Sequence, residues 1–330
     1  MRLFLAGDVG GTKTRLALVE VDGARVRVER ESSYPSRDHA GFDILLEDFL
    51  STADTVHHAA FGIAGPIQGR VVRTTNLPWL IDADALQQRF GFIRCSLLND
   101  LEATACGIPA LAGDDLLTLQ CGTPDAVGNL AVIAAGTGLG EAGMYWDGQR
   151  HHPFATEGGH ASFSSQSEME MVLLQQLQQR YGHVSWERIV SGMGLPDLYR
   201  FLRGYRKANT PVWLQQQMDE GDAAAAISAA ALSCADDICV ETMGWFVRLY
   251  GAEAGNLALK VMSRGGMYIG GGIAPKILPL LQNGDFMAAF LNKGRMRPLL
   301  EAMPVRVILN DRAALYGPAL RAAQLAGERE

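Results

Sequence analysis

The chain has 330 residues, of which 48% are hydrophobic and 20% are charged, and its formal net charge is −7. That length exceeds the size at which one hydrophobic core stops growing, so we expect two domains. The acidic balance argues against a nucleic-acid partner, but it leaves room for a nucleotide held by backbone N–H groups. No segment has the roughly eighteen unbroken apolar residues of a membrane helix, so we expect no membrane partner.

The five cysteines show no spacing typical of a metal site. Their odd number fits a reducing compartment, so we expect them to pack as free thiols and the protein to be cytoplasmic.

The first hundred residues alternate apolar strands with amphipathic helices. Strands are predicted at residues 3–6, 16–21, 26–28, 59–63 and 95–98. Helices are predicted at 41–50 and from a cap at Asp82 or Asp84 to Gly91. This alternation indicates an α/β fold.

The strand pattern begins again after Gly107, and helices then dominate. Further strands are predicted at residues 116–119, 130–135, 143–146 and 267–269. Helices are predicted after a capping box at Ser165, after a cap at Ser185, over 222–249 with a kink near Gly244, and from about Arg312 onward. The helix after Ser165 is expected to carry Met171, Leu174 and Leu177 and to end at Gly182.

Two glycine–threonine turns are the most informative feature of the chain. The first glycine turn (residues 8–12, Asp-Val-Gly-Gly-Thr) and the second (residues 136–140, Gly-Thr-Gly-Leu-Gly) each lie between two apolar runs. A glycine hairpin of this kind can direct its N–H groups at an anion. Two such hairpins predict two related halves that face one polyphosphate.

Polar residues follow a predicted strand at Asn99 and Asp100. Ligands usually bind at the carboxyl ends of strands in open α/β sheets. The alternative is that both residues only cap the helix beginning at Leu101.

A second polar group is formed by Glu157, two glycines and His160, with Glu187 further along the chain. The glycines allow both flanking side chains to face one small molecule, whereas a plain surface turn is the alternative. For Glu187 the alternative is stabilisation by a helix dipole. Asn76 adds an amide, or is simply part of a turn before a proline.

Together these carboxylates and neutral donors suit a ring of hydroxyl groups. A site built for a hydroxyl rejects molecules that lack it, because its own polar atoms are then left unpaired. The sequence therefore favours a sugar as the ligand.

The chain resembles the bacterial glucokinase family, within the sugar kinase, heat-shock chaperone and actin ATPase superfamily. The resemblance covers almost the whole length and rests on both glycine turns, Leu98-Asn99-Asp100, Glu157-Gly158-Gly159-His160, the segment 183–188 and Gly270-Gly271-Gly272-Ile273. It implies a two-lobed actin-like ATPase (ribonuclease H-like) fold with a deep cleft. The small α/β domain would comprise residues 1–110 and about 312–330, and the large one residues 111–311.

The resemblance also implies an ATP-dependent glucokinase, in which Asp100 is the catalytic base that activates the 6-hydroxyl of glucose. It implies glucose contacts from Asn99, Asp100, Glu157, His160 and Glu187, to which we add Asn76. The implied ATP and Mg²⁺ site comprises Gly7, Asp8, Val9, Gly10, Gly11, Thr12, Gly136, Thr137, Gly138, Gly271 and Gly272. Mg²⁺ is expected near Asp8 with the nucleotide rather than in a dedicated protein site, and a homodimer is the family expectation.

Three alternatives stay open. The nearest is a kinase for another hexose or an amino sugar. A non-catalytic sugar-responsive regulator would need a helix-turn-helix and a basic patch. A chaperone-like or cell-shape ATPase would have no need of the group around Glu157 and His160.

Overall fold

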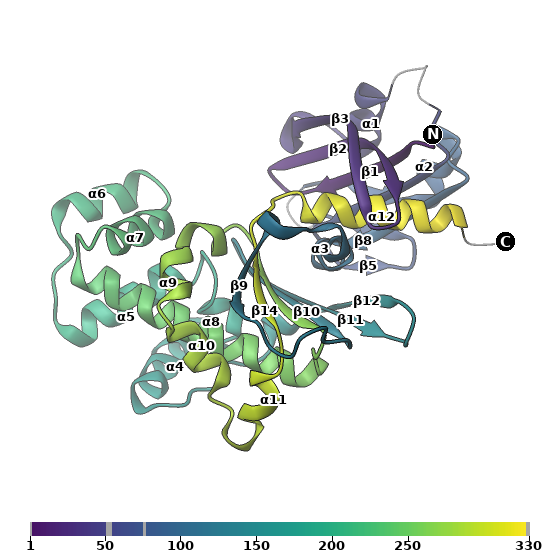
Figure 1. Ribbon diagram of the computed structural model, residues 1–330. Helices are drawn as coiled ribbons and strands as arrows, with labels where there is room; N and C mark the ends of the chain where they lie inside the picture. Colours follow the sequence, from purple (N-terminus) through teal and green to yellow (C-terminus); the bar gives the residue numbers. More distant parts are fainter. Residues whose placement is uncertain (1, 51–54, 75–76, 328–330) are drawn as a thin grey trace. The chain divides into compact units, whose positions relative to one another are not determined.

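The computed structural model describes residues 2–50, 55–74 and 77–327 (Figure 1). The chain forms two compact units. Unit 1 comprises Met1–Leu116, His152–Ala155 and Asn310–Glu330, and unit 2 comprises Leu117–His151 and Thr156–Leu309. The predicted site residue Asn76 lies outside the described residues.

Unit 1 is built on a five-stranded sheet of order β3-β2-β1-β4-β8. Its strands are β1 (Phe4–Val9), β2 (Lys13–Asp22), β3 (Arg25–Pro35), β4 (His58–Ile63) and β8 (Arg94–Asn99). The first three strands are antiparallel, whereas β4 and β8 run parallel to β1. A smaller antiparallel sheet contains β5 (Ile67–Gln68), β6 (Val71–Arg73) and β7 (Leu80–Asp82).

Four α-helices accompany these sheets: α1 (Phe42–Phe49), α2 (Ala83–Phe90), α3 (Asp100–Gly107) and α12 (Ala313–Gly327). The last of them, drawn in yellow in Figure 1, packs Leu315 and Ala319 against Phe4 and Ala60 of the sheet. Helices α3 and α12 approach so closely that a Cβ at Gly317 would collide with a backbone carbonyl of α3. Since α3 begins at Asp100, this packing anchors the end of β8.

A six-stranded sheet of order β12-β11-β10-β13-β14-β9 contains the strands of unit 2. Its strands are β9 (Leu116–Gln120), β10 (Leu130–Ala135), β11 (Leu139–Trp146), β12 (His151–Thr156), β13 (Gly266–Gly270) and β14 (Val305–Ile308). As in unit 1, an antiparallel hairpin (β10 and β11) precedes a parallel pair (β13 and β14). Apart from β9, the two sheets thus share one strand order, which is the relation between two halves that the two glycine turns predicted.

Helices make up most of the rest of unit 2. They are α4 (Glu168–Tyr181), α5 (Leu195–Arg206), α6 (Val212–Glu220), α7 (Ala223–Leu232), α8 (Asp237–Val261), α9 (Leu278–Gln282), α10 (Asp285–Leu291) and α11 (Arg297–Glu301). Short 3₁₀ helices include η4 (Gly158–His160) and η5 (Trp186–Arg188). The long helix α8 is fixed to the sheet by Tyr250, whose hydroxyl accepts a hydrogen bond from the Ala135 N–H and lies 3.2 Å from the Ile133 carbonyl oxygen.

The predicted helix over residues 222–249 with a kink near Gly244 is wrong. Two helices, α7 and α8, occupy this region, and Gly244 lies inside α8 without a break. The chain turns at Cys234, where φ is +54°, and the Asp236 side chain accepts the Cys239 N–H to cap α8. In the described part of the chain no single helix is long and apolar enough to cross a membrane. Helices α7 and α8 reach that length and apolarity only as a pair, bent by 102°.

The cap of α4 also differs from the prediction. Ser167, not Ser165, accepts the capping hydrogen bond, from the Glu170 N–H, and Glu170 accepts one from the Gln166 N–H. The same serine-to-glutamate spacing occurs twice in this segment, two residues apart, which explains the shift. Met171 is 49% exposed, whereas Leu177 is buried as expected. Gly182 ends the helix, as predicted.

Candidate active site

The first glycine turn joins β1 to β2 and is held by two buried hydroxyl groups. The Gly10 N–H donates to the Lys13 carbonyl at 3.0 Å. Beneath it, the Ser36 hydroxyl donates to the Gly10 carbonyl at 2.7 Å and lies 2.9 Å from the Thr14 hydroxyl. The Ser36 N–H donates to the Thr12 carbonyl at 2.9 Å. Because these hydrogen bonds connect the turn to itself and to Ser36, its conformation is set by the protein.

Asp8 is the first residue of this turn, and its carboxyl group lies in an environment unfavourable to charge. Burial raises the pKa of Asp8 to about 6, with further upward contributions from the charges of Asp100 and Asp311. Arg15 opposes this effect and is itself ion-paired with Asp311. The electrostatic interaction with Asp100 shows that unit 1 brings two of the predicted site residues near each other.

Asn99 and Asp100 lie where β8 ends and α3 begins. The Asn99 side-chain oxygen accepts the Leu101 N–H at 3.0 Å, and Glu102 accepts the Asn99 N–H at 3.2 Å, which completes a capping box. An Asp100 carboxylate oxygen also accepts the Leu101 N–H, at 2.9 Å. The capping interpretation is therefore correct. It leaves the functional prediction open, because capping fixes both side chains at the strand end where ligands bind.

The second glycine turn joins β10 to β11 and is held by a segment that the sequence analysis did not identify. The Gly136 N–H donates to the Gly138 carbonyl at 2.8 Å. From the other side, the Gly192 N–H donates to the Gly136 carbonyl at 2.8 Å and the Met193 N–H to the Thr137 carbonyl at 3.3 Å. No sequence signal marks residues 192–193, because their contribution is through the backbone alone.

Glu187 connects the second glycine turn to the other polar residues of unit 2. One of its carboxylate oxygens accepts the Leu139 N–H at 3.0 Å, and a Cβ at Gly138 would collide with this carboxylate. Glu187 lies in the first turn of η5, where the helix-dipole alternative places it, but η5 has only three residues and the carboxylate also binds the second glycine turn. Ser185 occupies the N-cap position of η5 but donates or accepts no capping side-chain bond among the described residues.

His160 lies between Glu157 and Glu187. Its two ring nitrogens are 3.8 Å from a Glu157 carboxylate oxygen and 3.9 Å from a Glu187 oxygen. The side chains of His160 and Glu157 are 62% and 72% exposed, so they are open to a ligand. Unit 2 thus assembles three of the predicted sugar residues, while Asn99 and Asp100 belong to unit 1.

A cavity of about 580 Å³ opens beside the second glycine turn. Its lining comprises Gly136, Thr137, Gly192, Met193, Leu195, Asp222, Ala224, Ala225, Ser228, Ala229, Leu232, Gly272, Ile273, Lys276 and Ile277. A Cβ at Gly136 or Gly272 would meet nothing within 4 Å, so open space lies over both glycines. Gly271 has φ +82°, which bends the chain sharply after β13.

One wall of this cavity is a face of α7 made of small side chains, which the sequence analysis missed. Asp222 caps the helix by accepting the Ala224 N–H at 2.9 Å, and Ala225, Ser228 and Ala229 follow along the lining. Apart from Leu232, the α7 residues that line the cavity after Asp222 have small side chains, which leave room for a ligand. The alanine-rich run was the available sequence signal.

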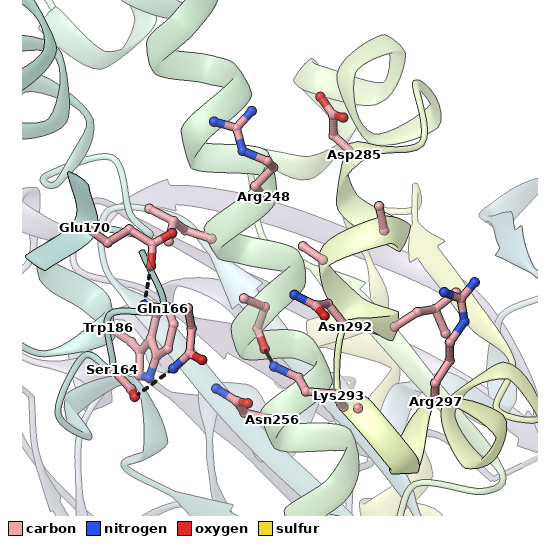
Figure 2. A pocket seen from close by; sticks show the side chains of 16 residues that line it. Ser164, Gln166, Glu170, Trp186, Arg248, Asn256, Asp285, Asn292, Lys293 and Arg297 are labelled. Carbon is pink, nitrogen blue, oxygen red and sulfur yellow. Dashed lines mark hydrogen bonds between the residues drawn. The ribbon is translucent and has the colours of Figure 1, made fainter. Parts of the chain in front are cut away.

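A second cavity in unit 2, of about 920 Å³, is lined mainly by α8, α10 and the segment that follows α10 (Figure 2). Its labelled residues include the cations Arg248, Lys293 and Arg297 and the carboxylates Glu170 and Asp285. None of the described residues predicted as site residues lines it. Within the described ranges, no group of three or more His, Cys, Asp or Glu side chains forms a candidate metal site.

Comparison with known proteins identifies the family of the chain. The family model described as glucokinase matches residues 5–325 of the chain. The chain is 44% identical to a glucokinase of Nostoc punctiforme over 341 aligned positions, which cover 98% of this chain and all of that protein. The chain belongs to the glucokinase family. It is therefore an enzyme of the hexose kinase class.

Solved structures agree with this assignment. A glucokinase from an Antarctic psychrotroph matches with a TM-score of 0.87 at 30% identity, over 98% of this chain and 99% of that one. A glucokinase of the ROK family from Streptomyces griseus, in complex with glucose and AMPPNP, matches with a TM-score of 0.65 at 22% identity, over 98% and 99%. The actin-like ATPase fold predicted from the sequence is confirmed.

Proposed function

We propose that this protein transfers the γ-phosphoryl group of ATP to the 6-hydroxyl of glucose, giving glucose 6-phosphate and ADP. One observation carries the proposal beyond family membership: the Glu187 carboxylate contacts both His160 and the backbone of the second glycine turn. Glu187, a residue suited to binding hydroxyl groups, therefore directly contacts the second glycine turn, a loop suited to binding phosphate, within unit 2.

In this proposal Glu157, His160 and Glu187 bind sugar hydroxyls from unit 2. Asn99, Asp100 and Asn76 bind them from unit 1. Carboxylates accept hydrogen bonds from hydroxyl groups, and such charge-assisted bonds are the stronger kind. The exposure of Glu157 and His160 leaves them available to the sugar.

Asp100 is the catalytic base. Phosphoryl transfer has a loose transition state, so catalysis depends mainly on positioning and on charge stabilisation. Asp100 accepts the proton of the attacking hydroxyl as the new phosphorus–oxygen bond forms. Its position at the first turn of α3, fixed by the Leu101 N–H, restricts where that hydroxyl can approach.

ATP is bound by both glycine turns. The residues proposed to hold it are Gly7, Asp8, Val9, Gly10, Gly11, Thr12, Gly136, Thr137, Gly138, Gly271 and Gly272. The cavity beside the second turn would hold the nucleoside, because open space lies over Gly136 and Gly272 and most α7 residues in its lining are small. AMPPNP in the Streptomyces griseus structure is an ATP analogue, which supports this choice.

Mg²⁺ would be held by the ATP phosphates with Asp8 nearby. The partly buried Asp8 carboxyl suits this role, because a cation would stabilise a charge that the protein alone disfavours. When bound, the ion neutralises phosphate charge during transfer.

We also propose that residues 1–110 with about 312–330 form the small domain and residues 111–311 the large one, and that the enzyme is a homodimer. A cytoplasmic location remains a prediction, supported by five cysteines that are all free thiols in the structure.

The decisive experiment is an incubation of purified protein with Mg²⁺, ATP and glucose, followed by identification of the products. Glucose 6-phosphate and ADP in equal amounts are expected, with no ADP release in the absence of sugar. A panel of hexoses and amino sugars under the same assay tests the nearest alternative. Faster turnover of another sugar, or sugar-independent ATP hydrolysis, would contradict the proposal.

A further inference from the structure

Two buried carboxyl groups, those of Glu141 and Glu253, form a pair that has no role in the proposed reaction. Glu141 lies on β11 and is 2% exposed, and Glu253 lies on α8 and is fully buried. The charge of Glu253 acts on the Glu141 carboxyl group, so the two groups lie close together. Two ionised carboxylates cannot share such a site at low cost, so one of them keeps a proton at neutral pH.

The surrounding donors decide which one keeps it. The Asn256 amide donates to Glu253 at 2.7 Å, and the Lys260 ammonium lies 3.4 Å from it. Lys293 faces the Glu253 charge from the pocket in Figure 2, where it donates to the Ala252 carbonyl. Glu253 is therefore the charged member of the pair.

Glu141 has no comparable set of hydrogen-bond donors in the described part of the chain to stabilise a negative charge. Its Oε1 atom has no hydrogen-bond partner among the described residues. Burial, followed by the charge of Glu253, raises the pKa of Glu141 to about 8, and Lys260 opposes this effect. The other titratable group facing it is Tyr250, whose hydroxyl stays neutral because burial raises the pKa of that group as well.

Glu141 also supports the turn that carries Glu157 and His160. A Cβ at Gly158 would collide with the Glu141 carboxyl group. The Thr156 hydroxyl donates to the Glu141 carbonyl at 3.0 Å and accepts the Gly158 N–H at 3.2 Å. The turn therefore rests on both the side chain and the backbone of Glu141.

We propose that protonated Glu141 is a positioning residue for the sugar-binding turn, and that its ionisation weakens hexose binding. This inference rests on the proposed function, since it takes Glu157 and His160 as sugar ligands. A second negative charge beside Glu253 would push the Glu141 side chain away from α8, and Gly158 packs directly against that carboxyl group. The turn would then move with it.

The test compares the wild-type protein with Glu141→Gln, in which an amide donor replaces the carboxyl proton without titrating. Glucose dissociation constants are measured by calorimetry from about pH 6.5 to about pH 9.5, together with KM for glucose and ATP. We expect wild-type glucose affinity to fall by up to about tenfold for each pH unit above the Glu141 pKa, with little change in the KM for ATP. Glu141→Gln should show no such fall, and the exposed Glu220→Gln serves as a matched control.

Gly158→Ala provides a second test that leaves the pair intact. Its Cβ would displace the turn, so the KM for glucose should rise by about tenfold or more, unlike in Gly204→Ala, where a Cβ meets nothing within 4 Å. A wild-type pH profile retained in Glu141→Gln, or an unchanged glucose KM in Gly158→Ala, would overturn the inference while leaving the kinase activity in place. A wild-type protein that phosphorylates no glucose at any pH would overturn the proposed function as well.

Discussion

The two glycine turns occupy equivalent places in two sheets of similar strand order, yet they are supported in different ways. The first rests on the hydroxyl groups of Thr14 and Ser36, both fully buried. The second rests on Glu187, a partly exposed carboxylate that also lies beside His160. Equivalent topology thus provides a glycine turn twice, and the local side chains decide what else each turn contacts.

This difference suggests a division of roles. The first turn is held by the Thr14 and Ser36 hydroxyl groups, neither of which is predicted to bind the sugar. Changes to these groups should therefore affect nucleotide binding alone. The second turn shares Glu187 with the sugar residues, so its geometry should depend on both substrates. Substitutions in each turn can break this contrast, whereas Asp100 belongs to neither turn.

Asp100→Asn should give the largest effect. It keeps an oxygen that can accept the Leu101 N–H but removes the proposed base, so kcat should fall by about 10²–10⁴-fold with glucose affinity largely retained. Steady-state kinetics with glucose calorimetry measures both quantities. Asp84→Asn, at an exposed position on α2, is the matched control. Near-normal turnover of the Asp100 variant would remove this residue from the chemistry.

Gly138→Ala should disturb both substrates. Its Cβ would collide with the Glu187 carboxylate, which displaces either the side chain or the second turn. We expect kcat/KM to fall about 10²-fold for glucose and for ATP, because small misplacements of reacting groups are costly. An effect confined to ATP, with glucose binding intact, would argue against the shared role of this turn.

Asp8 should make nucleotide use depend on pH below neutrality. Because burial raises its pKa to about 6, the carboxylate is lost as the pH falls, and kcat/KM for MgATP should drop about tenfold per pH unit below that value. Stability should change in the opposite direction. A carboxyl group whose pKa is raised on folding favours the folded state at low pH, and this contribution is lost as the pH rises through about 6.

Asp8→Asn should remove this contribution to the pH dependence of unfolding while abolishing most activity. Chemical denaturation between about pH 4 and about pH 8 measures the first effect. Identical pH dependence of the unfolding free energy in the wild-type protein and the variant would show that Asp8 is not held in an unfavourable environment.

Ser36→Ala should have the smallest effect and should be selective for the first turn. It removes one hydroxyl that donates to the Gly10 carbonyl, which costs about 1–2 kcal/mol of stability. The KM for ATP should rise a few-fold while glucose binding without nucleotide is unchanged. Ser233→Ala, an exposed serine after α7, is the control. A loss of glucose affinity in Ser36→Ala would contradict the prediction that the first turn affects nucleotide binding alone.

Local patterns in the sequence were enough to predict most strands and both glycine hairpins, and they narrowed the cap of α2 to Asp82 or Asp84, of which Asp82 is the cap. They placed the break between α7 and α8 wrongly, because the turn there depends on a positive φ at Cys234 rather than on a glycine or proline. The shifted cap of α4 has a similar origin, since serine recurs at Ser165 and Ser167 and only packing selects one of them.

The site was predictable as a set of residue types but not as a set of contacts. Glu157 and His160 are close in sequence, so their proximity could be expected. The contact of Glu187 with the Leu139 N–H spans 48 positions, and the Glu141–Glu253 pair joins a strand to a helix far along the chain. Such contacts arise only when the sheet and α8 pack together. Hydropathy patterns do not encode them.

Linkage between the two substrates tests the central claim most directly. The glucose dissociation constant is measured with and without a non-hydrolysable ATP analogue in the wild-type protein, Glu187→Ala and Ser36→Ala, the nucleotide being saturating in each. We predict that the analogue tightens glucose binding in the wild-type protein and in Ser36→Ala, and that this linkage is largely lost in Glu187→Ala. Full linkage in Glu187→Ala, together with its loss in Ser36→Ala, would contradict the account.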